Sequence, residues 1–132
     1  MIVHAGDFVE LGVLRQLERL GDVAAVHGNV DAADVRAELP ERRTFDTGEV
    51  RIGLVHDAGP ARGRLERLRR WFPEADAVVF GHSHIPMQEI APDGFQIFNP
   101  GSPTDRRRQP RHTMGIATAL AGRLEFELIS LD

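Results

Sequence analysis

Short apolar runs that end beside a glycine constrain the fold of this 132-residue chain more than any other feature. Residues 2–5, 23–26 and 77–80 have the length of buried strands, and a glycine follows each within two positions. Between them, residues 11–20 and 64–72 place leucines at helical spacing, and a glycine or proline comes directly after each segment. This alternation predicts an α/β fold whose first sheet is at least partly parallel.

The rest of the chain has mainly the period of β-strands. Residues 43–47 and 50–56 flank Gly48-Glu49 and predict a hairpin. We also expect a short helix at 31–39 and strands at 87–91, 95–98, 113–120 and 123–131. The length fits one domain, so residues 1–132 are interpreted as a single domain.

Composition narrows the classes of function. The absence of cysteine excludes disulfides, thiolate metal sites and a thiol nucleophile. No apolar run approaches the roughly 20 residues of a membrane span, and no signal peptide is recognisable, so we expect a cytoplasmic protein without a membrane partner. All 16 basic residues are arginines, but the net charge of -4 makes nucleic acid an unexpected partner.

Candidate metal ligands lie at or just after the ends of four of the expected strands. They are Asp7, Asn29, His56 and the pair His82 and His84. Because ligands of open α/β sheets bind outside the carboxyl ends of the strands, we expect these side chains to converge. Oxygen and imidazole donors without thiolate suit manganese, iron, zinc or nickel.

Each residue type has a physical reason to be there. The carboxylate of Asp7 can bridge two cations about 3.5–4 Å apart, and Asn29 offers an oxygen without adding negative charge. His82 and His84 are two positions apart, so in an extended segment both rings leave on the same face. A single Gly-Asp or Gly-Asn is usually only a turn, and His56 alone could be a structural strand end. The combination favours a metal site, whereas His4 is interpreted as structural.

The motif series resembles a known family. Gly6-Asp7, Gly28-Asn29, His56 and Gly81-His82-Ser83-His84, in this order, resemble the motifs of the calcineurin-like metallophosphoesterase superfamily. The resemblance is strongest to its small bacterial and archaeal phosphodiesterases, which also have a loop similar to residues 99–103. It implies a four-layer αββα sandwich and a metal-dependent phosphohydrolase, in particular a phosphodiesterase.

The same resemblance assigns roles to the candidate residues. Asp7 would bridge two divalent cations, with manganese as the first choice and nickel, iron or zinc as alternatives. Asn29, His56 and His82 would complete one site, and His84 would belong to the other. Asp7, Asn29 and His82 would be catalytic through this dinuclear centre, which activates water for attack on phosphorus without a side-chain nucleophile.

The sequence departs from the family pattern in three ways, the smallest being His56-Asp57-Ala58 where some relatives have His-Gly-His. It contains no Asp-x-His motif, so the site of His84 lacks two protein ligands. Either the chain is an N-terminally incomplete domain lacking its first β-α unit, or it is a single-metal or inactive variant. The inactive alternative would be a scaffold or binding module, as this fold is in the retromer complex. Val30 also occupies the position where many members place a histidine that protonates the leaving group.

Other polar residues suggest the substrate. Arg106 and Arg107 follow the 99–103 loop and could clamp a substrate phosphate, so the expected partner is a small phosphorylated molecule. Asp57 could orient a metal-bound histidine or simply face solvent. The arginine-rich segment 62–70 is most simply interpreted as a solvent-exposed helix surface. The sequence leaves open whether the protein forms a homo-oligomer.

Overall fold

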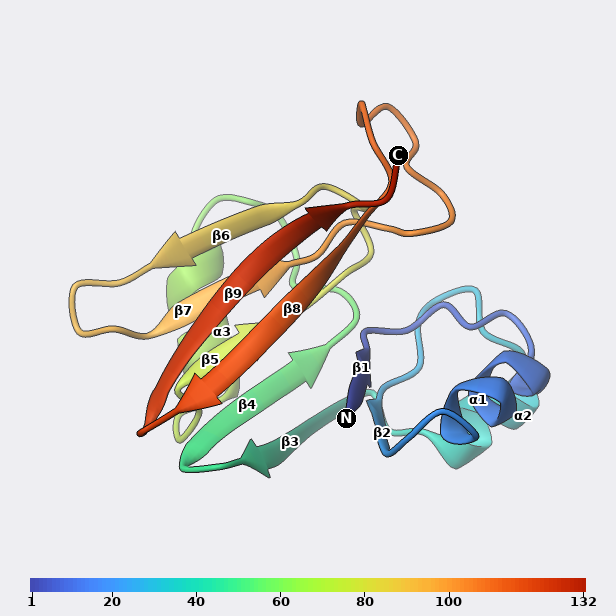
Figure 1. Cartoon of the computed structure of the whole chain (residues 1–132), viewed down its shortest axis with the longest axis horizontal. Coiled ribbons are helices and arrows are strands. Elements are labelled where there is room, and N and C mark those ends of the chain that lie inside the picture. Colours follow the sequence, from blue (N-terminus) through green and yellow to red (C-terminus); the bar gives the residue numbers. More distant parts are fainter.

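The computed structural model describes all residues, 1–132 (Figure 1). Its elements are β1 (Ile2–His4), α1 (Leu11–Glu18), β2 (Val23–Ala25), α2 (Ala33–Glu38), β3 (Arg42–Thr47), β4 (Val50–Val55), α3 (Arg64–Trp71), β5 (Ala77–Val79), β6 (Met87–Ile90), β7 (Gln96–Asn99), β8 (Thr113–Leu120) and β9 (Arg123–Ser130). Each expected helix and strand is present, with its ends displaced by at most two residues.

The strands form three sheets. The largest has the order β3-β4-β5-β7-β6, in which β4, β5 and β7 are parallel and the edge strands β3 and β6 are antiparallel to their neighbours. β1 pairs with β2 in parallel, and β8 forms an antiparallel hairpin with β9. The expected parallel pairing is therefore present in two sheets, and it directs the carboxyl ends of β4 and β5 to one edge.

Apolar clusters define how these layers stack. Helix α3 covers one face of the five-stranded sheet, where Leu68 and Phe72 pack with Val78, Phe80 and Ile97. Figure 1 shows α3 behind this sheet and the β8–β9 hairpin in front of it. The faint helix in that view is thus one outer layer of the protein.

The front face of the five-stranded sheet packs on the second β layer. Ile52 and Leu54 are in one cluster with Val26, and Leu124 and Phe126 of β9 pack against it. A separate cluster joins α1 and α2 to β2. Its buried members are Phe8, Leu14, Ala25 and Val35. The order is therefore helix, sheet, sheets, helices, which confirms the αββα expectation.

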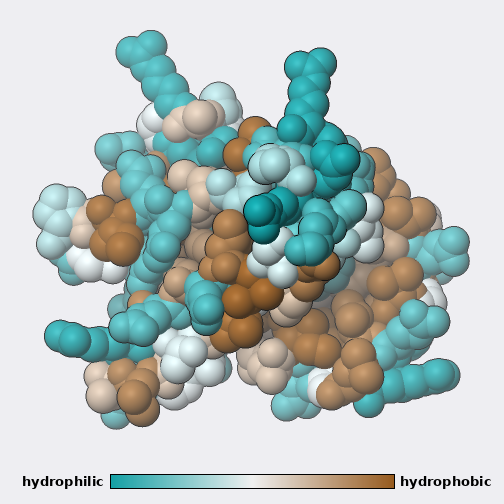
Figure 2. All heavy atoms as spheres, turned by 45° about the horizontal axis from the view of Figure 1, so that its top comes forward, coloured by the Kyte–Doolittle hydropathy of each residue, from teal (hydrophilic) through white to brown (hydrophobic).

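The second β layer consists of two separate pieces. β1 pairs only with β2, and β8 pairs only with β9. Apolar side chains that solvent reaches include Val3 on β1 and Met114, Ile116 and Leu120 on β8. Figure 2 shows brown apolar surface gathered in the middle of its view. No helix of the structure is both long enough and apolar enough to cross a membrane.

The α3 layer gives a direct test of this packing. Replacing Leu68, whose exposed fraction is 0%, by alanine should leave a cavity and lower the free energy of unfolding by about 2–5 kcal/mol. Urea denaturation would measure the loss. The control is Leu20→Ala, because this leucine is 78% exposed and its truncation should change the free energy by less than about 0.5 kcal/mol. Equal effects of the two substitutions would contradict the layer order.

Candidate metal centre

Glycines allow the loops after β1, β2 and β4 to approach one another closely. Gly6 has φ +101°, and a Cβ there would lie 2.8 Å from both the Gly28 nitrogen and His56 Nδ1. A Cβ on Gly28 would lie 2.6 Å from the Asp7 nitrogen. Any larger residue at either position would push these loops apart.

Four of the five predicted ligands form one cluster. His56 Nε2 lies 2.8 Å from Asn29 Oδ1 and 3.3 Å from Asp7 Oδ2. His82 Nδ1 lies 3.2 Å from both His56 Nε2 and Asn29 Oδ1. The four side chains come from loops that follow β1, β2, β4 and β5, so residues up to 75 positions apart in the chain meet at one edge.

The protonation of His56 follows from its neighbours. Its Nδ1 lies 2.7 Å from the carbonyl oxygen of Ala5, which can only accept, so Nδ1 carries the proton. In the neutral ring, Nε2 then has a free lone pair, and this atom faces the other cluster members. A backbone carbonyl that fixes the tautomer in this way is the usual support of a metal-binding histidine.

The cluster brings together more hydrogen-bond acceptor atoms than there are donor protons to satisfy them. His56 Nε2 and Asp7 Oδ2 both present lone pairs, and they crowd around Asn29 Oδ1 and His82 Nδ1. A divalent cation would satisfy all of them, so the donor set fits a metal ion. No group of three or more histidine and acidic side chains is by itself arranged to hold a metal ion. The candidate site therefore includes the amide oxygen of Asn29.

His84 lies apart from these contacts. Its Nδ1 donates to the carbonyl oxygen of Asp105 at 2.6 Å, which leaves Nε2 free in the neutral ring, as at His56. His82 and His84 have φ values of 67° and 61°, so the segment is left-handed at both residues. The expectation of an extended segment is wrong, because the backbone is left-handed at both residues; His82 contacts Asn29 and His84 contacts Asp105.

The two predicted phosphate-binding arginines differ in their surroundings. Arg106 donates to the carbonyl oxygen of Gln109 within its own loop. Arg107 Nη1 lies 3.4 Å from the carbonyl oxygen of Ser83, between the two histidines of the β5 loop. Asp57 Oδ2 is 3.9 Å from His82 Nε2, while Asp57 Oδ1 accepts from the nitrogen of Gly59. Arg107 is thus the better placed of the two arginines.

Buried polar side chains that the sequence analysis did not select hold these loops. The Asn99 side chain, in a residue with 0% exposure, donates to Gly81 O and Ser83 Oγ and accepts from Gly101 N. Asp31 accepts from three backbone nitrogens of the β1 and β2 loops. The family-like loop at 99–103 includes Asn99 and could have indicated this residue. No periodic pattern in the sequence indicates Asp31.

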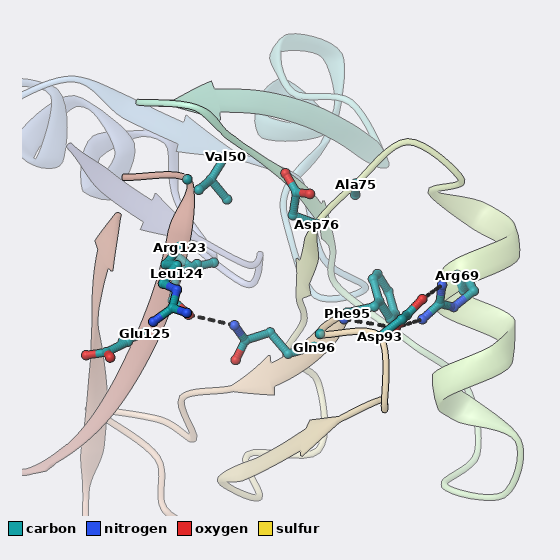
Figure 3. A pocket seen from close by; sticks show the side chains of 12 residues that line it. Val50, Arg69, Ala75, Asp76, Asp93, Phe95, Gln96, Arg123, Leu124 and Glu125 are labelled. Atoms are coloured by element: carbon teal, nitrogen blue, oxygen red, sulfur yellow. Dashed lines mark hydrogen bonds and ion pairs between the residues drawn. The ribbon is translucent and has the colours of Figure 1, made fainter. Parts of the chain in front are cut away.

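Two of the hollows on the surface bear on the site. The larger of the two, about 470 Å³, is lined by residues of the five-stranded sheet, of α3 and its neighbouring loops, and of the β8–β9 hairpin, and by none of the predicted ligands (Figure 3). Its Arg69 and Asp93 already form an ion pair, and Gln96 donates to the carbonyl of Leu124. The smaller, about 180 Å³, includes Asn29 and His56. Asn29 and His56 present lone pairs that a cation could bind, so donor chemistry favours the smaller hollow, although the other has the greater volume.

His4 supports the first loop. Its Nδ1 accepts from the nitrogen of Gly6 at 3.1 Å, and its ring stacks on Phe8 with centroids 3.7 Å apart. Burial lowers the pKa of His4 from 6.5 to about 4, and the nearby carboxylates of Asp31 and Asp7 only partly oppose this effect. At neutral pH His4 is therefore uncharged, consistent with a structural role.

This pKa predicts a pH dependence of stability. The unfolded chain binds a proton at His4 below pH 6.5, and the folded protein does so only near pH 4, so stability falls as the pH drops through this window. The contribution amounts to about 3 kcal/mol. His4→Asn keeps an acceptor for Gly6 but cannot titrate. In metal-free urea denaturation between pH 7 and pH 4, the variant should lose less stability than the wild type, and identical losses would contradict the burial of His4.

Layered sheets with oxygen and imidazole donors at one edge are an arrangement that suits proteins binding hard divalent cations. The family model of the calcineurin-like phosphoesterase superfamily domain matches residues 1–122. The chain belongs to this superfamily.

Two archaeal relatives carry the name probable metallophosphoesterase. The protein of Methanothermobacter thermautotrophicus is 38% identical over 106 residues, which are 79% of this chain and 60% of that protein. The protein of Methanocaldococcus jannaschii is 31% identical over 135 residues, covering 100% of this chain and 67% of its own length. The chain thus spans about two thirds or less of these relatives.

Solved structures show the same fold. A solution structure of the Thermotoga maritima protein TM1076 has a TM-score of 0.74 at 30% identity, covering 98% of this chain and 79% of that one. Vps29 of Entamoeba histolytica in complex with zinc has a TM-score of 0.74 at 20% identity, with 98% and 81% covered. A structure described as a novel archaeal phosphodiesterase has a TM-score of 0.71 at 22% identity, with 96% and 81% covered.

Proposed function

We propose that the protein is a metal-dependent phosphohydrolase that acts on phosphodiesters through a dinuclear centre. Asp7 would bridge the two cations, with Asn29, His56 and His82 on one of them and His84 on the other. The observation that carries the proposal is the cluster of lone pairs within 3.3 Å of His56 Nε2. Such crowding stabilises the folded protein only when a cation lies among the donors.

The chemistry divides between cofactor and chain. Divalent cations bound there would lower the pKa of a water molecule and stabilise negative charge on phosphoryl oxygens. The chain supplies a neutral oxygen from Asn29, which keeps the site attractive to an anion. Ser83 is no nucleophile, because its hydroxyl accepts from Asn99 and from the nitrogen of Ile85. Val30 offers no proton, so substrates with good leaving groups are favoured.

Phosphate recognition is assigned to Arg107. Its guanidinium lies against Ser83, and its charge has no carboxylate partner. Arg106 bonds within its own loop and contributes less. The substrate would be a small phosphorylated molecule of the cytoplasm, where we place the enzyme.

Two comparisons support parts of this proposal. The archaeal neighbour is described as a phosphodiesterase, and the Vps29 neighbour is described with zinc. The donor set of imidazole, amide and carboxylate accepts manganese, zinc, nickel or iron. Manganese remains our first choice, because oxygen donors make up half of the cluster.

A scaffold is the second candidate function. Apolar side chains exposed on β8, among them Met114 and Ile116, give the protein a surface on which another protein could pack. Vps29, a protein of vacuolar sorting by its printed name, has the same fold. A scaffold needs neither a cation nor hydrolysis, so metal binding and hydrolysis measured together separate the two candidates.

Metal binding and hydrolysis test the first candidate. The chain should bind Mn²⁺ in calorimetric titration and hydrolyse bis-p-nitrophenyl phosphate when Mn²⁺ is added. His82→Ala removes one donor and should weaken Mn²⁺ binding by about a hundredfold or more. His112→Ala is the matched control, because His112 pairs with Asp132 and not with the cluster.

The outcomes separate the candidates. Mn²⁺ binding that is equal in the wild type and in His82→Ala would contradict the assigned ligands. Tight binding without hydrolysis would favour the scaffold, as would a folded wild-type protein that takes up no metal.

Arg107 gives a test of substrate recognition. Arg107→Ala should raise KM about tenfold with kcat nearly unchanged, which corresponds to one charge-assisted hydrogen bond of about 1.5 kcal/mol. The steady-state kinetics of the chromogenic diester measure both constants. Arg108→Ala is the control, since Arg108 makes no hydrogen bond or ion pair and should leave KM as it is. A tenfold effect at Arg108 instead would place the phosphate elsewhere.

A further inference from the structure

Asp31 is a buried carboxylate that joins two loops of the candidate metal centre. Its exposed fraction is 7%. Oδ2 accepts from the nitrogens of Asp7 at 3.0 Å and Gly28 at 2.6 Å, and Oδ1 accepts from the nitrogen of Val9 at 2.7 Å. One side chain thus holds the loop that carries Asp7 against the loop that carries Asn29.

The loop held by Asp31 is strained. Asp7 and Val9 have φ values of 65° and 72°, in the left-handed region that residues other than glycine rarely adopt. For Val9 the penalty is larger, because its side chain branches at Cβ. The backbone nitrogens of both strained residues, Asp7 and Val9, donate to the Asp31 carboxylate, as does the nitrogen of Gly28. These hydrogen bonds offset the strain where it occurs.

The carboxylate of Asp31 has no cationic side chain as a partner. Nearby Arg36 donates to the backbone carbonyl oxygens of Asp31 and Asn29, not to the carboxylate. The negative charge is therefore stabilised by backbone N–H groups alone, and three donors require both oxygens. An asparagine of the same shape could not replace it, since one of its two atoms is a donor.

The orientation of Asp7 depends on this arrangement. Asp7 Oδ1 accepts from the nitrogen of Val30, in the loop that Asp31 ties to the Asp7 backbone. Asp7 Oδ2 then points to His56 Nε2, 3.3 Å away. Because the nitrogens of Asp7 and Gly28 both donate to Asp31 Oδ2, this oxygen sets the distance between the loop that carries Asp7 and the loop that carries Asn29.

We propose that Asp31 is a positioning residue of the metal centre, which sets the carboxylate of Asp7 relative to Asn29 and so determines metal affinity. The inference rests on the proposed function, because it concerns the same site. Asp31 touches neither metal nor substrate and acts through the backbone of residues 7 and 28.

The experiment compares Mn²⁺ binding by the full chain with that of four variants: two single substitutions of acidic residues, and Val9→Gly with and without Asp31→Asn. Asp31→Asn should raise the dissociation constant for Mn²⁺ about 10–100-fold, as expected when a group that orients a metal ligand is lost. Asp34→Asn is the control, because it removes the same charge from an exposed residue nearby whose carboxylate accepts only from Val35. In ¹⁵N-correlated NMR spectra without metal, the amide resonances of Asp7, Val9 and Gly28 should shift in Asp31→Asn and stay in place in Asp34→Asn.

Val9→Gly separates positioning from charge. Glycine adopts φ 72° without strain, so the loop conformation depends less on the hydrogen bonds to Asp31. The effect of Asp31→Asn on Mn²⁺ affinity should therefore be several-fold smaller in the Val9→Gly background. A charge effect would be equal in both backgrounds and would overturn the inference. The Val9→Gly background also supplies the comparison if Asp31→Asn alone does not fold.

Failure of the two proposals gives different results. Equal Mn²⁺ affinities of the wild type and folded Asp31→Asn would overturn the role of Asp31 and leave the metal centre standing. A wild-type chain that binds no Mn²⁺ would overturn both.

Discussion

The hydrogen bond from His56 Nδ1 to the carbonyl of Ala5 is the contact on which the candidate site depends. His56 follows β4 of the five-stranded sheet and Ala5 follows β1 of the other layer, so this bond joins the two β layers at the edge where the ligand loops meet. It also determines which ring nitrogen of His56 faces Asn29. A single interaction thereby sets both the separation of the layers and the chemistry of the donor between them.

Much of the fold could be predicted from the sequence because short apolar runs and helical leucine spacing reflect burial directly. Residues 77–80 illustrate this: the run is too short for a typical helix and a glycine follows it, so it fits a buried strand. The meeting of Asp7, Asn29, His56 and His82 was predictable for a similar reason, since each follows a strand and parallel strands end together.

The features of the site that could not be predicted depend on backbone angles and backbone hydrogen bonds, which produce no periodic pattern in the sequence. The left-handed φ of His82 and His84 replaces the expected extended segment, and the two rings have different partners, Asn29 and Asp105. Asp31 escaped notice because its partners are backbone nitrogens, which every residue except proline possesses and which no sequence pattern displays. A buried acid two residues after Gly28-Asn29 was the one available signal.

The electrostatics of the cluster favour a cation over a purely structural arrangement. One carboxylate, one amide and two neutral imidazoles carry a net charge of −1, and even one divalent cation would change this to +1, which would attract an anion. A scaffold would gain nothing from lone pairs that face one another, and apolar residues of similar volume would stabilise it better. The glycines at positions 6 and 28, which bring the loops so near, add to this argument, because close approach of electron-rich atoms is useful only when something positive lies between them.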